Sequence, residues 1–162
     1  MDAASGANPP FVHFVRVGWG DCDPARIAFT GRLAAFALEA IDAWWEHVVG
    51  ADWYRMNIDH GVGTPFVHMT LDFRSPVTPR HRLACEVRLL RLGASSVRLG
   101  VRGRQDGKLC FEGQFVQALL RAPDYIKFEV PEDVLAKLRS ADVADESRWA
   151  GPDKIALDRG SV

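Results

Sequence analysis

The stretch GDCDPARIAFTG, residues 20–31, places two carboxylates around a cysteine. It follows a segment with strand character and precedes one in which apolar residues recur at helical spacing. The first peptide N–H groups of a helix lack intrahelical acceptors and favour nearby negative charge. A carbonyl oxygen held against the N–H groups of Thr30 and Gly31 would be polarised, and Asp23 could then attack the carbonyl carbon or activate water. The stretch could therefore support attack on a carbonyl group.

The same residue types suit other roles. Asp21 and Asp23 are also typical loop and cap residues, and spacing alone favours that interpretation. A calcium-binding loop would need a glycine and a later glutamate that the D-C-D stretch lacks. Cys22 has no base close to it in the sequence, and the five histidines occur singly. The sequence thus predicts no metal site and no cofactor.

Length and composition are those of one globular domain, with 162 residues, 48% hydrophobic and 25% charged. No apolar run approaches the roughly 18 residues that span a bilayer, and the N-terminus lacks the features of a signal peptide. We therefore expect a cytoplasmic protein that does not enter membranes. The three cysteines, Cys22, Cys85 and Cys110, show no paired spacing and are expected to be small buried thiols.

Charge is unevenly distributed, although the net charge is only −1. Residues 74–104 contain eight arginines and a single acid, Glu86, so this segment carries +7 and the remainder −8. The near-neutral total predicts no general affinity for nucleic acid, whereas the arginine-rich segment could hold a small polyanion. The simpler interpretation is that these arginines point outward from strands and keep a sheet soluble.

The hydrophobic pattern predicts an α+β fold. Residues 11–18 favour a strand, residues 33–48 a long amphipathic helix closed by Gly50, and four strands with period-two alternation follow. The dipeptide Asp106-Gly107 predicts a hairpin turn, and Pro131 is expected at the first position of the last helix. A curved sheet that wraps one helix leaves an edge strand exposed, so we expect a homo-oligomer, a dimer or a tetramer.

The organised domain is predicted to span residues 11–139. Residues 1–10 and 140–162 are rich in small, polar and charged residues without sustained periodicity. We therefore expect a flexible N-terminus and a loosely docked C-terminal tail.

Two motifs resemble one known family. GDCDPARIAF, residues 20–29, closely resembles the G-D-C-D-P-A-G-I-V motif of 4-hydroxybenzoyl-CoA thioesterases, and HGVGTPFV, residues 60–67, resembles that family's entry to the strand after the helix. The resemblance implies the hotdog fold, in which a curved antiparallel sheet wraps a long central helix. It also implies a cofactor-free enzyme that hydrolyses an aromatic, 4-hydroxybenzoyl-CoA-like acyl-CoA to the free acid and coenzyme A. Asp23 would be the nucleophile or general base, and the helix-start amide at Thr30 would polarise the thioester carbonyl.

The resemblance also indicates residues that bind the substrate. Gly31 and Arg26 lie in the matching region, while Asp21 is expected to order the loop. The family binds coenzyme A at subunit interfaces and uses basic side chains for its phosphates, so we select Arg82 and Arg98 from the arginine-rich segment. The planar guanidinium group suits this role because it donates two parallel hydrogen bonds to a phosphate.

Two departures from the family pattern keep alternatives open. Arg26 stands where the motif has glycine, and Leu38 stands where the hydroxybenzoyl enzymes have a carboxylate associated with the substrate hydroxyl. One alternative is a hotdog protein that binds an acyl-CoA without turnover, and another is a thioesterase for short-chain aliphatic acyl-CoA. A dehydratase of the same fold would need a histidine and carboxylate motif that this sequence lacks.

Overall fold

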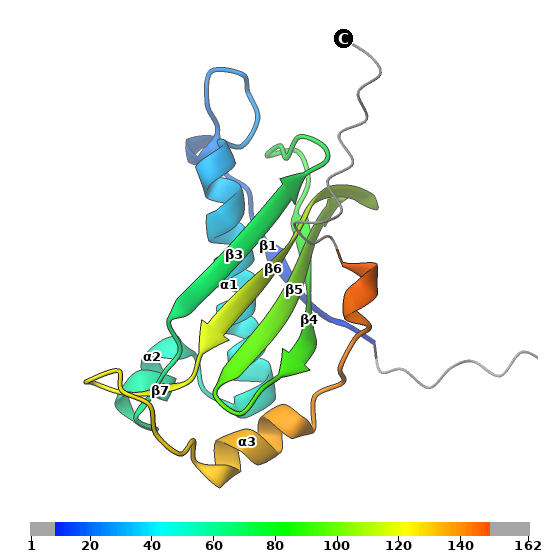
Figure 1. Ribbon diagram of the computed structural model, residues 1–162. Coiled ribbons are helices and arrows are strands. Elements are labelled where there is room, and N and C mark those ends of the chain that lie inside the picture. The colour runs from blue at the N-terminus through cyan, green and yellow to red at the C-terminus, as the bar shows by residue number, and fades with distance from the viewer. Residues whose placement is uncertain (1–8, 150–162) are drawn as a thin grey trace, which may run out of the picture.

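The computed structural model describes residues 9–149, which form a five-stranded antiparallel sheet with one long helix against its inner face (Figure 1). The strand order is β1-β4-β5-β6-β3, so β1 and β3 are the edges. The main elements are β1 (Phe11–Val15), α1 (Thr30–Val49), β3 (Phe66–Phe73), β4 (Leu83–Leu92), β5 (Ser96–Gln105) and β6 (Lys108–Ala118). This arrangement confirms the predicted α+β fold with a long helix on a curved antiparallel sheet.

Shorter elements complete the chain. They are the 3₁₀ turn η1 (Trp19–Asp21), α2 (Trp53–Ile58), β2 (Val62–Gly63), β7 (Leu120–Arg121), α3 (Glu132–Arg139) and the 3₁₀ turn η2 (Glu146–Arg148). Strands β2 and β7 pair with each other in a second, two-stranded sheet that the sequence pattern did not indicate. Among the described residues, no helix is long and apolar enough to cross a membrane.

Helix α1 forms because its apolar residues return to one face every three or four positions. That face is buried against the sheet and includes Phe36, Ile41, Trp44 and Trp45. The helix ends at Gly50, whose φ of 85° is the left-handed conformation typical of a residue that terminates a helix. It begins at Thr30, which confirms the helix start expected at Thr30 and Gly31. The apolar pattern alone marks the helix only from residue 33, because the first turn is polar.

The inner face of the sheet is built from alternate residues of the paired strands. Cys85, Val87 and Leu89 of β4 share this face with Val101 and Leu99 of β5, and all five are buried. The residues between them point to the outer face, as the period-two pattern predicted. The predicted hairpin is also confirmed, because Asp106 and Gly107 have φ of 52° and 74° and join β5 to β6.

Two predicted boundaries are corrected. The first strand ends at Val15 instead of Gly18, because the chain then turns into η1 and the Gly18 N–H donates to the Asp21 carboxylate at 2.8 Å. Pro131 precedes α3 as its N-cap and is not its first helical residue. Proline has no backbone N–H, and at this position the helix loses no hydrogen bond for that reason.

The first residues of the predicted C-terminal tail lie against the sheet. Val143 pairs in parallel with Leu89, beside β4 beyond the end of β1. Trp149 is buried over Gly100, where an added Cβ would lie 2.5 Å from the indole ring. Residues 1–8 and 150–162, which make up most of the two predicted terminal segments, lie outside the described residues.

One buried polar group links α1 to the sheet. The Trp45 indole Nε1–H donates to Gln117 Oε1 at 2.9 Å, and Gln117 Nε2–H donates to the Thr64 carbonyl at 2.8 Å. A buried group that loses its partner is costly, because no water replaces the lost hydrogen bond. Gln117 therefore fixes α1 relative to β6 and to the chain before β3.

We predict that Gln117→Met lowers the free energy of unfolding by about 1–3 kcal/mol, because it leaves the Trp45 N–H and the Thr64 carbonyl unpaired. Urea unfolding measures this loss. A double-mutant cycle with Trp45→Phe should show a coupling energy, since both variants remove the same bond. Strictly additive losses would contradict the assignment.

Candidate active site

The segment between β1 and α1 is a small hydrogen-bonded loop. Cys22 and Ala28 pair as an antiparallel bridge, and the Asp23 N–H donates to the Ile27 carbonyl at 3.0 Å. The Ala28 N–H donates to the Val77 carbonyl at 2.8 Å, which joins the loop to the chain before β4. These bonds hold the loop against the start of α1 (Figure 1).

Asp21 orders this loop. Its carboxylate accepts the Gly18 N–H and the Arg32 Nε–H, both at 2.8 Å, and its carbonyl accepts the Phe29 N–H at 2.8 Å. The Gly18 N–H and the Arg32 guanidinium hold the pKa of Asp21 below its usual value, since both stabilise the ionised form. Asp21 is thus bonded on both oxygens, in agreement with the ordering role expected for it.

Asp23 differs from Asp21 in having a free carboxylate oxygen. One oxygen accepts the Ala25 N–H at 2.8 Å, and within residues 9–149 no hydrogen bond or ion pair engages the other. The side chain is half-buried, and Pro24 restricts the backbone of Asp23 to extended conformations. The carboxylate is therefore positioned by the loop and still able to reach a ligand.

The N-terminus of α1 offers hydrogen-bond donors beside this loop. Phe29 is the N-cap and supplies no side-chain acceptor, and the first turn contains no acid. The N–H groups of Thr30 and Gly31 therefore lack the intrahelical and capping acceptors that would otherwise satisfy them. The Phe29 ring lies so close to Gly31 that an added Cβ would be 2.8 Å from it, so the glycine lets this aromatic ring approach the helix start.

The profile of the Thioesterase-like superfamily matches residues 17–138, a range that contains the loop and α1. The chain belongs to the thioesterase-like superfamily. Its hotdog fold and its activity as a thioester hydrolase, both predicted from the motifs, are confirmed at this level.

Solved structures agree with this membership. A thioesterase superfamily protein from Jannaschia sp. CCS1 is 45% identical, with a TM-score of 0.80 over 88% of this chain and 99% of that one. The 1,4-dihydroxy-2-naphthoyl-CoA thioesterase from Synechocystis is 17% identical, with a TM-score of 0.72 over 82% and 97% of the two chains. A DHNA-CoA thioesterase from Staphylococcus aureus is 9% identical, with a TM-score of 0.69 over 79% and 89%. The last two show a common fold only. No curated protein matches the sequence.

The thioesterase motif carries a strained residue at its tip. Arg26 has φ of 65°, the left-handed conformation that glycine adopts without steric cost, and its side chain is exposed. This backbone conformation explains why the family motif has glycine at the position of Arg26. The backbone hydrogen bonds of Asp23 and Ala28 hold the loop on either side of Arg26.

The predicted substrate-binding arginines lie at opposite ends of the sheet. Arg82 is exposed and directly precedes β4, at the end where Ala28 bonds to Val77. Arg98 lies near the start of β5, at the far end, where its guanidinium pairs with Glu146. The structure therefore brings Arg82, but not Arg98, to the same end as Asp23, Thr30, Gly31 and Arg26.

Four of the eight arginines in residues 74–104, including Arg98, form ion pairs with acidic side chains. Arg102 and Arg74 lie 3.1 and 3.3 Å from Glu112 of β6, and Arg88 lies 3.1 Å from Glu86. The sequence count missed Glu112 because strand pairing, and not chain order, places it opposite Arg102. For these arginines the structure supports the simpler interpretation of a solvated sheet face.

Of the three cysteines, Cys22 lies in the active-site loop and the other two lie in β4 and β6. Cys85 and Cys110 are buried, and burial raises the pKa of Cys85 to about 12. Cys22 is half-buried, which corrects the expectation that all three thiols are buried. Within the part of the chain that the structure describes, no group of His, Cys, Asp and Glu side chains could hold a metal ion.

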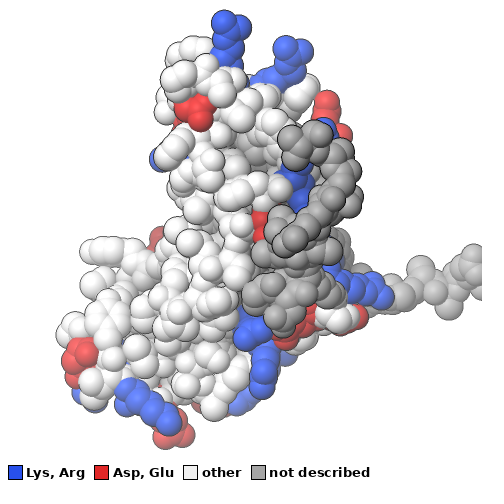
Figure 2. Space-filling model, turned by 45° about the horizontal axis from the view of Figure 1, so that its top comes forward, with Lys and Arg blue, Asp and Glu red and all other residues white. Residues whose placement is uncertain are grey.

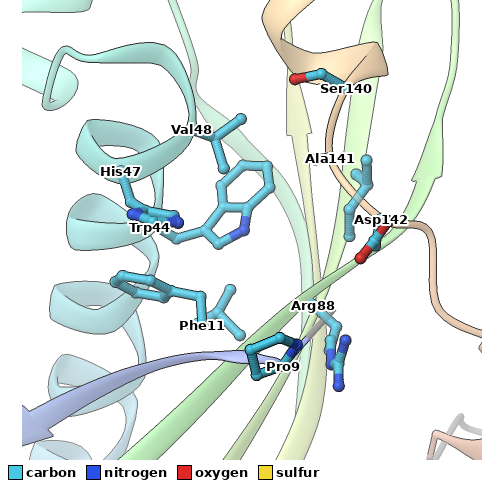
Figure 3. A pocket seen from close by; sticks show the side chains of 11 residues that line it. Pro9, Phe11, Trp44, His47, Val48, Arg88, Ser140, Ala141 and Asp142 are labelled. Carbon is cyan, nitrogen blue, oxygen red and sulfur yellow. The ribbon is translucent and has the colours of Figure 1, made fainter. Parts of the chain in front are cut away.

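A cavity of about 260 Å³ lies at the other half of α1 from Asp23 (Figure 3). Trp44 points into it, and the rings of Phe11 and His47 stack beside it with centres 4.9 Å apart. Arg88 and Asp142 lie at its far side. It contains no residue of the loop, so it is separate from the candidate active site.

Sequence reasoning missed two aromatic residues at the site, Trp19 and Phe29, which are both exposed. The sequence does offer a signal for Trp19, because a large aromatic residue between two glycines, Gly18-Trp19-Gly20, is unusual. Phe29 ends the motif GDCDPARIAF, and nothing in the sequence distinguishes it from the other motif residues.

We predict that Arg26→Gly raises the free energy of unfolding by roughly 0.5–1 kcal/mol, because relief of the left-handed strain exceeds the added entropy of the unfolded chain. Asp106→Gly is the matched control, since aspartate tolerates its φ of 52° in a turn far better than arginine does. Thermal and urea unfolding measure both. Equal effects of the two substitutions would contradict strain at Arg26.

Proposed function

We propose that this protein hydrolyses an aromatic, 4-hydroxybenzoyl-CoA-like acyl-CoA to the free acid and coenzyme A. The observation that carries the proposal is the free oxygen of Asp23 beside the uncapped start of α1. An electrophilic carbonyl needs a nucleophile or base on one side and hydrogen-bond donors for its developing charge on the other. The loop brings both together in one segment of chain.

In the proposed reaction, the thioester oxygen accepts hydrogen bonds from the N–H groups of Thr30 and Gly31. Asp23 either attacks the carbonyl carbon or takes a proton from the water that attacks it. Negative charge develops on the oxygen, and the helix dipole of α1 adds to its stabilisation. The carbon–sulfur bond then breaks, and coenzyme A leaves as a thiolate that takes up a proton. Attack by water gives the free acid directly, whereas attack by Asp23 gives a mixed anhydride that a water molecule hydrolyses to the free acid and the Asp23 carboxylate.

An aromatic acyl group is supported by the character of the neighbouring side chains. The exposed ring of Phe29 lies at the helix start, and Leu38 is a half-buried apolar residue on the same helix. Fold neighbours that act on aromatic esters, among them gentisyl-CoA and 1,4-dihydroxy-2-naphthoyl-CoA thioesterases, agree with this class. Leu38 offers no charge to a para-hydroxyl group, so the second candidates are an acyl-CoA with an apolar or differently substituted aryl group and a short-chain aliphatic acyl-CoA.

We further propose that two copies associate through β3. This edge strand exposes apolar side chains, with Val67 64%, Met69 49% and Phe73 51% accessible. Figure 2 shows a broad surface without charged side chains on the side of the molecule where β3 lies. An unpaired apolar edge favours pairing with a second copy, which would also enclose the exposed end of the active site. We also propose that the protein acts in the cytoplasm, as expected for an enzyme whose substrate is a coenzyme A ester.

We expect Asp23→Asn to lower kcat by about 10²–10⁴-fold, because it removes a positioned nucleophile or base. Affinity for the substrate and melting temperature should change little. The assay follows release of free coenzyme A thiol from a panel of aromatic and aliphatic acyl-CoA esters. An Asp23→Asn protein as active as the parent would remove Asp23 from the mechanism and favour binding without turnover.

Asp21→Asn is the matched control in the same loop. Because Asp21 bonds to Gly18 and Arg32, this variant should lose stability, and its loss of kcat should be small relative to its lower melting temperature. Equal losses of activity and stability in the two variants would indicate general damage to the loop.

We predict that the parent protein has at least twice the 18.0 kDa mass of one chain in light scattering, and that Met69→Arg shifts it toward one chain. The arginine would place an unpaired charge in the apolar interface. His68→Arg, on the opposite face of β3, should preserve the parent mass. A parent protein that is monomeric at working concentration would exclude the proposed interface.

A further inference from the structure

The cavity of about 260 Å³ that Figure 3 shows lies where the edge of the sheet is interrupted. Strand β1 pairs with β4 only from Phe11 onward. Residues 9 and 10 are prolines, which have no N–H to donate to a longer ladder between these strands. Further along β4, Leu89 pairs instead with Val143 of the segment after α3. Arg88 therefore lies on β4 between the start of β1 and this second neighbour.

One side of the cavity is aromatic. Trp44 points into it from α1, and the ring of Phe11 stacks on that of His47 with an interplanar angle of 28°. Trp44 is only 3% exposed and packs edge-on against Trp45, so its position is fixed. Val48 adds an apolar group one helical turn after Trp44. This wall suits a small ligand group that is flat or branched and apolar.

The opposite side of the cavity carries one positive and one negative charge. Arg88 and Asp142, both in the described part of the chain, lie there without an ion pair between them. The half-buried Arg88 donates its Nε–H to Glu86 Oε1 at 3.1 Å, and a guanidinium group has five N–H donors in all. Within residues 9–149, no hydrogen bond or ion pair engages the exposed Asp142 carboxylate. A ligand with a single charge would be attracted by one of these groups and repelled by the other.

We propose that this cavity binds a free α-amino acid with an apolar side chain. Its carboxylate binds Arg88, its ammonium group binds Asp142, and its side chain packs against Trp44 and Phe11. Near pH 7 a free amino acid carries both charges. The two charged groups are attached to one carbon atom, and the side chain leaves that atom in another direction. This arrangement matches a cavity with both charges on one side and aromatic rings on the other.

Size and charge distinguish this ligand from the ester and the acid of the proposed reaction. Sites for drug-sized ligands measure roughly 300–1,000 Å³, so a cavity of about 260 Å³ suits one amino acid and is too small for an acyl-CoA. An aromatic acid without an ammonium group would place its carboxylate beside that of Asp142. The cavity shares no residue with the loop of Asp23, so the inference does not rest on the proposed hydrolysis.

Calorimetry with the full chain tests the proposal. The compounds are L-phenylalanine, L-leucine, glycine, 3-phenylpropionate, which lacks the ammonium group, and 2-phenylethylamine, which lacks the carboxylate. We expect L-phenylalanine or L-leucine to bind about tenfold or more tightly than each of the other three, because only these two meet both charges and the aromatic wall. Absence of binding, or equal binding of any of the other three, would overturn the proposal.

Substitution of Asp142 gives a result that damage to the fold cannot imitate. Asp142→Asn should weaken binding of the amino acid about tenfold and tighten binding of 3-phenylpropionate, because it removes an attraction for the ammonium group and a repulsion of the carboxylate. Asp133→Asn is the matched control, since Asp133 is exposed on α3 and does not line the cavity. Equal effects of the two variants, or weaker binding of both compounds to Asp142→Asn, would contradict the assignment.

The arginine is tested in the same way. Arg88→Gln should weaken binding of the amino acid about tenfold, whereas Arg104→Gln in β5, outside the cavity, should not. Because Arg88→Gln also loses the bond to Glu86, its melting temperature is measured beside its affinity. Unchanged affinity in a folded Arg88→Gln protein would remove the carboxylate from this position and overturn the proposal.

Tryptophan fluorescence locates the ligand. Binding should change the emission of the parent protein, Trp44→Phe should remove most of that change, and Trp149→Phe should keep it, since Trp149 does not line this cavity. Asp23→Asn should bind the amino acid as the parent does, whether or not the parent hydrolyses esters. A fluorescence change that persists in Trp44→Phe, or loss of binding in Asp23→Asn, would place the ligand elsewhere and overturn the proposal.

Discussion

The burial of α1 against the inner face of the sheet determines where the chemistry can lie. The apolar stripe of the helix includes two tryptophans, and it can be removed from water only by packing along the strands. Trp45 also fixes the position of the helix along the sheet, because its buried indole N–H donates a hydrogen bond to Gln117. The start of the helix is thereby brought to the end of the sheet where β4 begins, and the loop before it bonds to Val77.

Two carboxylates in one loop have different surroundings. Asp21 is enclosed by the Gly18 N–H and the Arg32 guanidinium, which stabilise its charge and leave it no free oxygen for a substrate. Asp23 makes one local bond and keeps an oxygen available. The uncapped helix start faces the same loop, so the structure leaves its donors free at the position where a carbonyl oxygen would need them. A cap residue at position 29 would stabilise the helix and occupy those donors.

Features that depend on local pattern could be predicted from the sequence. The spacing of Phe36, Ile41 and Trp44 indicated the helix, and Asp106-Gly107 indicated the hairpin, because both depend on neighbouring residues alone. The partners of the arginines could not be predicted in this way. Glu112 meets Arg102 through strand pairing, and Glu146 meets Arg98 through the path of the chain after α3. A charge count along the chain therefore overstated the free positive charge and did not separate Arg82 from Arg98.

The most direct test of the proposed active site is a crystal structure with an aromatic acyl-CoA analogue in which a methylene group separates the sulfur from the carbonyl, so that it cannot be hydrolysed. We expect the carbonyl oxygen about 3 Å from the backbone nitrogen of Thr30 or Gly31, and the Asp23 carboxylate about 3–3.5 Å from the carbonyl carbon or bonded to a water at that distance. An acyl group in the cavity beside Trp44, or a carbonyl out of hydrogen-bonding reach of the start of α1, would contradict it.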